Sequence, residues 1–294
     1  ALMLEPRGHA DMYGGIVTPP VSADADFGVL FLHNEGYSSM CGHGIIAITT
    51  AALETGLVPS RSPETTVRID APAGLITAHA RIEEGRVAEV RFENVASFVL
   101  ELDAVVEVPG YGAVTYDLAY GGAFYAYVDV AKLGLTTTPA DVEGLIRAGR
   151  AIKTAVMRSR EIPHPFEADL GFLYGTIFVG PPLPAEAEPA SETPGVHSRN
   201  VCVFADGEVD RSPTGTGVSG RLAIHHARGE LELDRTILIE SILGTRFRGR
   251  ILQEIPFGPH AAIIPEVTGQ AFITGRHEFL IDPRDPLGKG FMLR

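Results

Sequence analysis

Cys41 lies in a glycine-rich stretch of the chain and is followed at once by Gly42, His43 and Gly44. Apolar residues at helical spacing come next, which predicts that Cys41 stands at the first turn of a helix. Free N–H groups and the helix dipole stabilise a thiolate there, so Cys41 is a candidate base or nucleophile. A cysteine that only packs is the alternative, and Cys202, inside an apolar strand, fits that description better. Without a visible secretion signal, we expect two free thiols rather than a disulfide.

Three other chemistries can be tested against the same residues. A zinc site needs more ligands than Cys41 and His43, and no Cys-x-x-Cys or His-x-x-x-His pair occurs in the sequence. The glycine motifs lack the lysine of a phosphate loop and the full spacing of a dinucleotide fingerprint. We therefore expect neither a metal nor a nucleotide. A thiol hydrolase of the Cys-His-Asn type needs a distant histidine, and several could serve, so this alternative stays open.

The helix that must position Cys41 has a counterpart later in the chain. Residues 41–56 read CGHGIIAITTAALETG and residues 214–229 read TGTGVSGRLAIHHARG, with glycine at the second, fourth and last positions of both. Both patterns predict short buried helices that end on a glycine suited to a left-handed cap. The flanking segments match as well: YGGIVTPP from Tyr13 with YGTIFVGPP from Tyr174, GVLFLHNEG with NVCVFADGE, and TVRIDAPAG with TILIESILG.

This repeat predicts the order strand, strand, helix, strand, strand, twice over. It indicates two similar α/β domains related by a pseudo-two-fold axis, each with mixed or antiparallel strands wrapped around one central helix. A duplicated scaffold with no site between its halves is the alternative. Glycines at both helix starts favour a site, because a backbone must approach something closely there. Two helix amino termini that face one cleft would bind a carboxylate.

Asp210 lies four residues before Thr214, in the segment DRSPTGTG that leads into the second helix. An ionised aspartate there could accept hydrogen bonds from a cationic amine of a ligand. An ordinary loop or capping role is the alternative, since aspartate favours turns. His225 and His226, in the middle of the second helix, are interpreted as packing or surface residues.

The charge of the whole chain limits its partners. The 294 residues carry a formal net charge of −13, and the 24 Lys and Arg residues are scattered rather than gathered into a stripe. Such a chain repels nucleic acid and anionic lipid, so a small-molecule partner is favoured. The sequence shows neither an apolar stretch of transmembrane length nor a basic-then-apolar leader, which predicts no membrane contact and a cytoplasmic location. Residues 181–194 are expected to form a polar loop.

Five segments of the sequence resemble the proline racemase family. They are EPRGHADMYG (5–14), GYSSMCGHG (36–44), YGGAFYAYVD (120–129), DRSPTGTG (210–217) and ESILGTRF (240–247). The resemblance covers essentially the whole chain, and the family includes hydroxyproline 2-epimerases and trans-3-hydroxy-L-proline dehydratases. The chain begins inside the family pattern, without the usual leading strand, so we expect part of the first domain to be missing from the sequence.

The resemblance implies an α+β fold like that of diaminopimelate epimerase, with the active site in the cleft between two pseudo-symmetric domains. We expect the first domain, which carries the Cys41 helix, to comprise residues 1–118 and 276–294. The second, which carries the Thr214 helix, would comprise residues 119–275. Strands around Phe279 to Phe291 would return to the first domain. The family resemblance also suggests a homodimer.

The family further implies roles for residues at the two helix starts. Its racemases begin each helix with a cysteine, one taking the Cα proton and the other delivering a proton to the opposite face; here Cys41 matches the first and Thr214 replaces the second. No cofactor takes part. Ala123 stands where the family usually has asparagine, so one contact near the site is expected to be absent. The ligand contacts of the family carry over to Gly42, His43, Gly44, Asp210, Gly215 and Thr216.

Thr214 changes the expected reaction, because a threonine hydroxyl is too weak an acid to alternate between protonated and ionised forms near neutral pH. The resemblance links the Cys/Thr pairing to trans-3-hydroxy-L-proline dehydratases. In that substrate the Cα hydrogen and the 3-hydroxyl lie on the same ring face, so a single residue could serve both. We expect a lyase that forms Δ1-pyrroline-2-carboxylate, with Cys41 as Cα proton acceptor. The alternatives are a proline racemase or 4-hydroxyproline 2-epimerase, and a non-catalytic amino-acid-binding protein.

Overall fold

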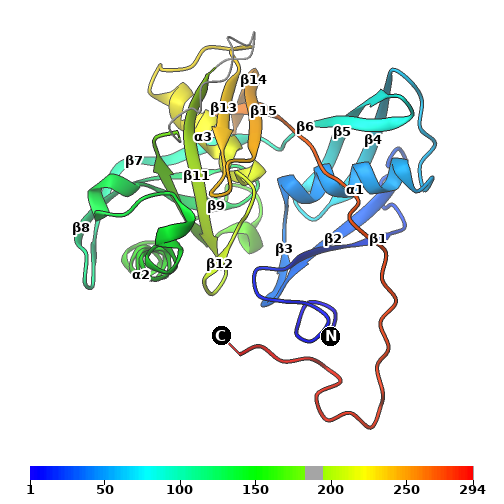
Figure 1. Ribbon diagram of the computed structural model, residues 1–294. Coiled ribbons are helices and arrows are strands. Elements are labelled where there is room, and N and C mark those ends of the chain that lie inside the picture. Colours follow the sequence, from blue (N-terminus) through cyan, green and yellow to red (C-terminus); the bar gives the residue numbers. More distant parts are fainter. Residues whose placement is uncertain (183–194, 294) are drawn as a thin grey trace.

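Two lobes make up the part of the chain that this computed structural model describes, residues 1–182 and 195–293 (Figure 1). Their strands join edge to edge into one hydrogen-bonded network. The two lobes meet where the strand Arg86–Glu93 of the first lobe pairs antiparallel with the strand His260–Gly269 of the second. None of the described helices is long and apolar enough to cross a membrane.

The first lobe wraps its strands against one helix. Its elements are β1 (Tyr13–Thr18), β2 (Phe27–His33), β3 (Gly36–Ser38), α1 (Gly42–Glu54), β4 (Glu64–Ala71), β5 (Gly74–Glu83) and β6 (Arg86–Glu93). Burial alternates along β4 and β5, which is the period-two pattern of strands with one face on a core. Ile45, Ile46 and Leu53 of α1 pack into the same core.

The second lobe is larger and buries its central helix more completely. Its strands and α-helices are β7 (Ser97–Val108), β8 (Gly112–Tyr120), β9 (Phe124–Asp129), α2 (Val142–Ser159), β10 (Leu173–Gly180), β11 (Val196–Phe204), β12 (Glu208–Val209), α3 (Gly215–Ala227), β13 (Ile237–Glu240), β14 (Arg246–Phe257) and β15 (His260–Gly269). Every residue of α3 from Gly215 to Ile224 is buried, so α3 has no solvent-facing stripe over that length.

The predicted repeat is confirmed element by element. In each half two antiparallel strands and a short third strand precede the helix, and an antiparallel pair follows it. The strand before each helix pairs in parallel with the strand after it, β2 with β4 and β11 with β13. Gly56 and Gly229, which follow the two helices, have φ values of 78° and 70° and so provide the predicted left-handed ends.

Two regions differ from the sequence-based expectations. β7 and β8 pack with α2 in the core of the second lobe, although the predicted division assigns residues up to 118 to the first domain. We therefore propose that the second domain begins near residue 95. The prediction of strands around Phe279 to Phe291 is wrong. The described chain is irregular from residue 270 to 290 and pairs only at Phe291, through an isolated bridge to Glu5.

Figure 1 shows this carboxyl-terminal segment running along the first lobe to end near the amino terminus. Most of the polar loop predicted over residues 181–194 lies outside the described residues.

Candidate functional site

The starts of α1 and α3 abut at two glycines. A Cβ atom added to Gly42 would lie 2.5 Å from Cα of Gly215, and one added to Gly215 would lie 2.7 Å from Cα of Gly42. No larger residue fits at either position without pushing the helices apart. The glycines of the repeat therefore allow the two amino termini to face one shared site.

Cys41 occupies the N-cap of α1, in an extended backbone conformation. Its Sγ atom accepts a hydrogen bond of 3.2 Å from the Gly44 N–H, and the side chain is buried. Cys41 thus lies at a helix start, as predicted, and the backbone of Gly44 provides the hydrogen bond to its thiol. The N–H groups of Gly42 and His43 have no partner within the helix by its geometry, which leaves them for a ligand.

Thr214 occupies the equivalent N-cap of α3 but in a different conformation. Its φ of 64° lies in the left-handed region, which is costly for a β-branched residue. The hydroxyl does not cap α3; it donates to Asp210 Oδ2 at 2.9 Å instead. The backbone N–H of Thr214 donates to Ser212 Oγ at 3.0 Å, which completes the tie to the preceding loop.

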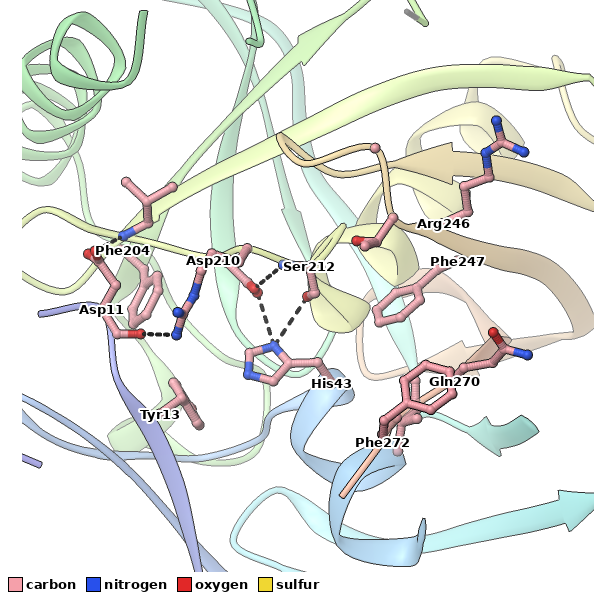
Figure 2. A pocket seen from close by; sticks show the side chains of 16 residues that line it. Asp11, Tyr13, His43, Phe204, Asp210, Ser212, Arg246, Phe247, Gln270 and Phe272 are labelled. Atoms are coloured by element: carbon pink, nitrogen blue, oxygen red, sulfur yellow. Dashed lines mark hydrogen bonds and ion pairs between the residues drawn. The ribbon is translucent and has the colours of Figure 1, made fainter. Parts of the chain in front are cut away.

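Asp210 joins the two lobes through His43. His43 Nδ1 lies 3.1 Å from Asp210 Oδ2 and 3.2 Å from Ser212 Oγ, and the Ser212 N–H donates to Asp210 Oδ1 at 2.7 Å (Figure 2). An ionised carboxylate offers about four acceptor positions. His43, Ser212 and Thr214 share those of Asp210, which fixes the carboxylate between the two lobes.

The charges of this pair follow from their mutual contact. Burial acts to lower the pKa of His43, but Asp210 and Cys41 outweigh it and raise that pKa well above its usual value. Burial acts to raise the pKa of Asp210, yet the His43 charge and hydrogen bonds from His43 and Ser212 lower it. At neutral pH the site holds an imidazolium beside a carboxylate.

Both helix starts open on one small cavity, whose volume is about 20 Å³. This is roughly the space of one water molecule. A wider hollow of about 770 Å³ adjoins it and shares four of its lining residues (Figure 2). The shared residues are Tyr13, His43, Phe204 and Asp210. A proline-sized ligand is several times larger than the inner cavity, so groups that line the cavity must shift to admit it.

Sequence reasoning missed the aromatic hydroxyls of the cavity. Tyr125 and the predicted ligand contact Thr216 share a hydrogen bond of 2.9 Å between their hydroxyls. Tyr13 forms a hydrogen bond with Ser38, and Tyr174 lies close to both. The repeat contains a signal for two of them, because it aligns Tyr13 with Tyr174 in the same way as it aligns the two helix starts.

Cys202 also lines the cavity, although its apolar strand predicts a residue that only packs. It is buried in β11, and burial, followed by the charge of Asp210, raises its pKa well above the usual value. Both cysteines are free. Cys202 is therefore a neutral thiol close to the Thr214 hydroxyl rather than a second thiolate.

The remaining candidates lie away from the cavity or pack beside it. Ala123 is buried in the adjoining apolar cluster with Tyr125. His225 contacts Glu230 and Arg221 near the far end of α3, in agreement with a packing role. Within residues 1–182 and 195–293 there is no group of three or more His, Cys, Asp or Glu side chains that could hold a metal ion.

Comparison with known proteins relates this geometry to a family. The proline racemase family model matches residues 1–292. A trans-3-hydroxy-L-proline dehydratase of Colwellia psychrerythraea is 51% identical over the whole chain, which covers 80% of that protein. A 3-hydroxyproline 2-epimerase of Burkholderia multivorans is 49% identical over the whole chain and 85% of its own length.

A solved structure agrees with these matches. The hydroxyproline epimerase of Agrobacterium vitis, with bound trans-4-hydroxy-L-proline, superposes with a TM-score of 0.90 at 35% identity and covers 99% of this chain and 81% of that one. The predicted two-domain epimerase fold is thereby confirmed. This chain belongs to the proline racemase family.

Proposed function

We propose that this protein dehydrates trans-3-hydroxy-L-proline to Δ1-pyrroline-2-carboxylate. The observation that carries the proposal is the asymmetry of the two helix starts: a thiol at Cys41 faces the cavity opposite a threonine whose hydroxyl is already donated to Asp210. Such a site has one group able to accept a proton from carbon. Racemisation needs two, whereas elimination needs one.

The substrate carboxylate would bind at the two helix starts. There it receives hydrogen bonds from the N–H groups of Gly42, His43, Gly215 and Thr216, supported by the dipoles of α1 and α3. The substrate amine would bind at the buried Asp210 carboxylate, beside the Thr214 hydroxyl. These contacts stabilise the negative charge that develops when the Cα proton leaves, and they are strong because the closed cavity excludes water. We expect no cofactor to be required.

Cys41 then serves both halves of the elimination. Its thiolate takes the Cα proton, and the resulting thiol gives a proton to the departing 3-hydroxyl on the same ring face. Water and an enamine form, Cys41 returns to the thiolate, and the enamine tautomerises to the pyrroline. The Thr214 side chain fills the space on the opposite face of the substrate ring.

An epimerase is the second candidate, because a relative of nearly equal similarity carries the name 3-hydroxyproline 2-epimerase. Incubation with proline, trans-4-hydroxy-L-proline and trans-3-hydroxy-L-proline, without added cofactor, separates the candidates. Chiral chromatography measures inversion and a colour reaction measures pyrroline. We expect pyrroline from the 3-hydroxy isomer and no inverted amino acid. An inverted product without pyrroline would replace the dehydratase by an epimerase.

If no amino acid changes but one of them raises the melting temperature, the protein is a binding protein.

The proposal extends to a cytoplasmic location, supported by the two free cysteines, and to a homodimer, supported by the family resemblance. Light scattering on a sizing column would detect the dimer, and cell fractionation would test the location.

A further inference from the structure

The buried hydroxyl of Tyr174 lies close to Tyr13 and Ser38 but makes no hydrogen bond of good geometry with either. Only 8% of the residue is exposed, and among the described residues its hydroxyl finds no hydrogen bond of good geometry. A buried polar group left unpaired costs free energy and calls for an explanation. Tyr174 lines the inner cavity together with Cys41, so the open position of its hydroxyl belongs to the site.

The internal repeat shows why Tyr174 lacks the well-formed hydrogen bond that Tyr13 has. Its counterpart Tyr13 bonds to Ser38, which lies three residues before Cys41. Three residues before Thr214 the chain has Arg211, an exposed side chain that donates to the backbone oxygen of Asp11 at 3.2 Å. The Tyr174 half of the repeat therefore lacks the serine that satisfies Tyr13.

Packing holds the Tyr174 ring in place. It stacks on Phe204 with ring centroids 5.5 Å apart and meets the edges of Tyr125 at 5.9 Å and His33 at 6.1 Å. A ring fixed on three sides presents its hydroxyl without the entropy cost of ordering it on binding. The hydroxyl is thus preorganised on the side of the cavity that also holds Tyr13 and Ser38.

The phenols of this cluster keep their protons. Burial raises the pKa of Tyr174 far above its ordinary value; contact with Tyr13 lowers that pKa in part, and the neighbouring Cys41 charge raises it further. Burial and Cys41 act in the same direction on the pKa of Tyr13. A phenol in this state donates a hydrogen bond but does not transfer its proton.

We propose that the Tyr174 hydroxyl donates a hydrogen bond to the 3-hydroxyl of the substrate and holds that group beside Cys41 for departure. This inference rests on the proposed dehydration. The Cα–H bond breaks to form the Cys41 S–H bond; the carbon electron pair forms the C2=C3 bond as the C3–O bond breaks. The departing oxygen takes the proton from Cys41 and leaves as water. Tyr174 begins and ends the cycle protonated, so the balance needs no further reactant.

Tyr174→Phe tests the proposal, because it removes only the unpaired hydroxyl. We expect kcat for pyrroline formation to fall about 100-fold, as when one preorganised donor to a developing charge is lost. Deuterium exchange at Cα of L-proline in heavy water, which has no leaving group, should stay close to the wild-type rate. The melting temperature should be equal or higher. Tyr116→Phe, which removes a buried hydroxyl of β8 away from the cavity, is the matched control and should leave both rates unchanged.

Dehydration at the wild-type rate in Tyr174→Phe would overturn the proposal, and so would a parallel loss of dehydration and proline exchange. Binding provides a readout that does not depend on turnover. In a Cys41→Ala background, Tyr174→Phe should weaken binding of trans-3-hydroxy-L-proline by about tenfold and leave that of L-proline unchanged. If the wild type forms no pyrroline, the dehydratase proposal fails by itself. Equal binding changes for the two ligands would then refute the role of Tyr174.

Discussion

The two helix starts differ in what their first side chains can do with a proton. Cys41 keeps a thiol at the edge of the cavity, held by one backbone N–H and lying near a cationic His43. Thr214 stands at the equivalent place, and its hydroxyl proton points to the ionised Asp210. Giving up that proton would place a second negative charge beside the carboxylate. We therefore propose that one face of the site exchanges protons with carbon and the other does not.

Thr214→Cys tests this asymmetry. A thiol at the start of α3 would restore the second acid–base group, so we expect the variant to invert some trans-3-hydroxy-L-proline at Cα while pyrroline formation continues. Chiral chromatography of the remaining substrate measures the inversion. Thr214→Ser keeps a hydroxyl and should show none. If the cysteine variant also shows none, more than this residue separates dehydration from epimerisation.

Individual site residues differed in how well the sequence predicted them. Cys41 and Asp210 stand in motifs with glycine and turn residues, and the structure brings them together with His43 and Thr214 as expected. For Tyr174 and Cys202 the sequence predicts only a place in a strand. The register between neighbouring strands decides which face of a strand lines the site. Here that register is the pairing of β10 with β9 and β11, and the local sequence does not determine it.

At the scale of elements, the contact between α1 and α3 sets the distance between the two sides of the site. Gly42→Ala would place a methyl group 2.5 Å from Cα of Gly215 and force the helix starts apart. A displacement of about 1 Å in a positioned site can cost about 100-fold in rate, so we expect kcat to fall at least tenfold. Steady-state kinetics measure this.

Ala47→Ser, at an exposed position of the same helix, is the control for Gly42→Ala. Full activity of Gly42→Ala would show that the close approach of the two helices is not required.

The elements themselves were predictable where the repeat described them. The strand order around α1 and α3 follows the repeat, because each half must wrap its strands around a buried helix. Among the described residues, α2 and the strands β7 to β9 have no counterpart in the first half, so self-similarity could not predict them. The residues around Phe279 have the composition of strands but find no neighbouring strand edge, and they remain irregular.

At the scale of the whole molecule, contacts between the two lobes line one side of the cavity. Asp11 accepts from the Val209 N–H at 3.0 Å, His33 lies 3.4 Å from Glu208, and His43 meets Asp210. The middle contact is not an ion pair. Burial, followed by a positive charge nearby, lowers the pKa of His33 to about 4, and its Nδ1 accepts a hydrogen bond from the Glu35 N–H.

Glu208 makes stability depend on pH. Burial, followed by the charges of Glu35, Asp11 and Asp206, raises its pKa from 4.5 to about 7. The folded protein disfavours the ionised form of Glu208. The free energy of unfolding therefore falls as pH rises from 4.5 to about 7, and the loss is complete above that pH. Glu208→Gln should therefore raise the melting temperature by about 3 °C or more at pH 8 and give little gain at pH 5.

Scanning calorimetry at both pH values measures the Glu208 effect, and Glu107→Gln, at an exposed position of β7, controls for loss of charge alone. An equal gain for Glu208→Gln at pH 5 and pH 8 would contradict the assignment.

Cys41→Ser tests the central claim most directly, because it replaces the one group proposed to take the Cα proton by a hydroxyl of similar size. Pyrroline formation from trans-3-hydroxy-L-proline and deuterium exchange at Cα should both fall at least about 1,000-fold, with an unchanged melting temperature. The matched variant Cys202→Ser, which also removes a buried thiol, should keep most of the activity. Turnover by Cys41→Ser at more than a small fraction of the wild-type rate would contradict a one-thiol mechanism.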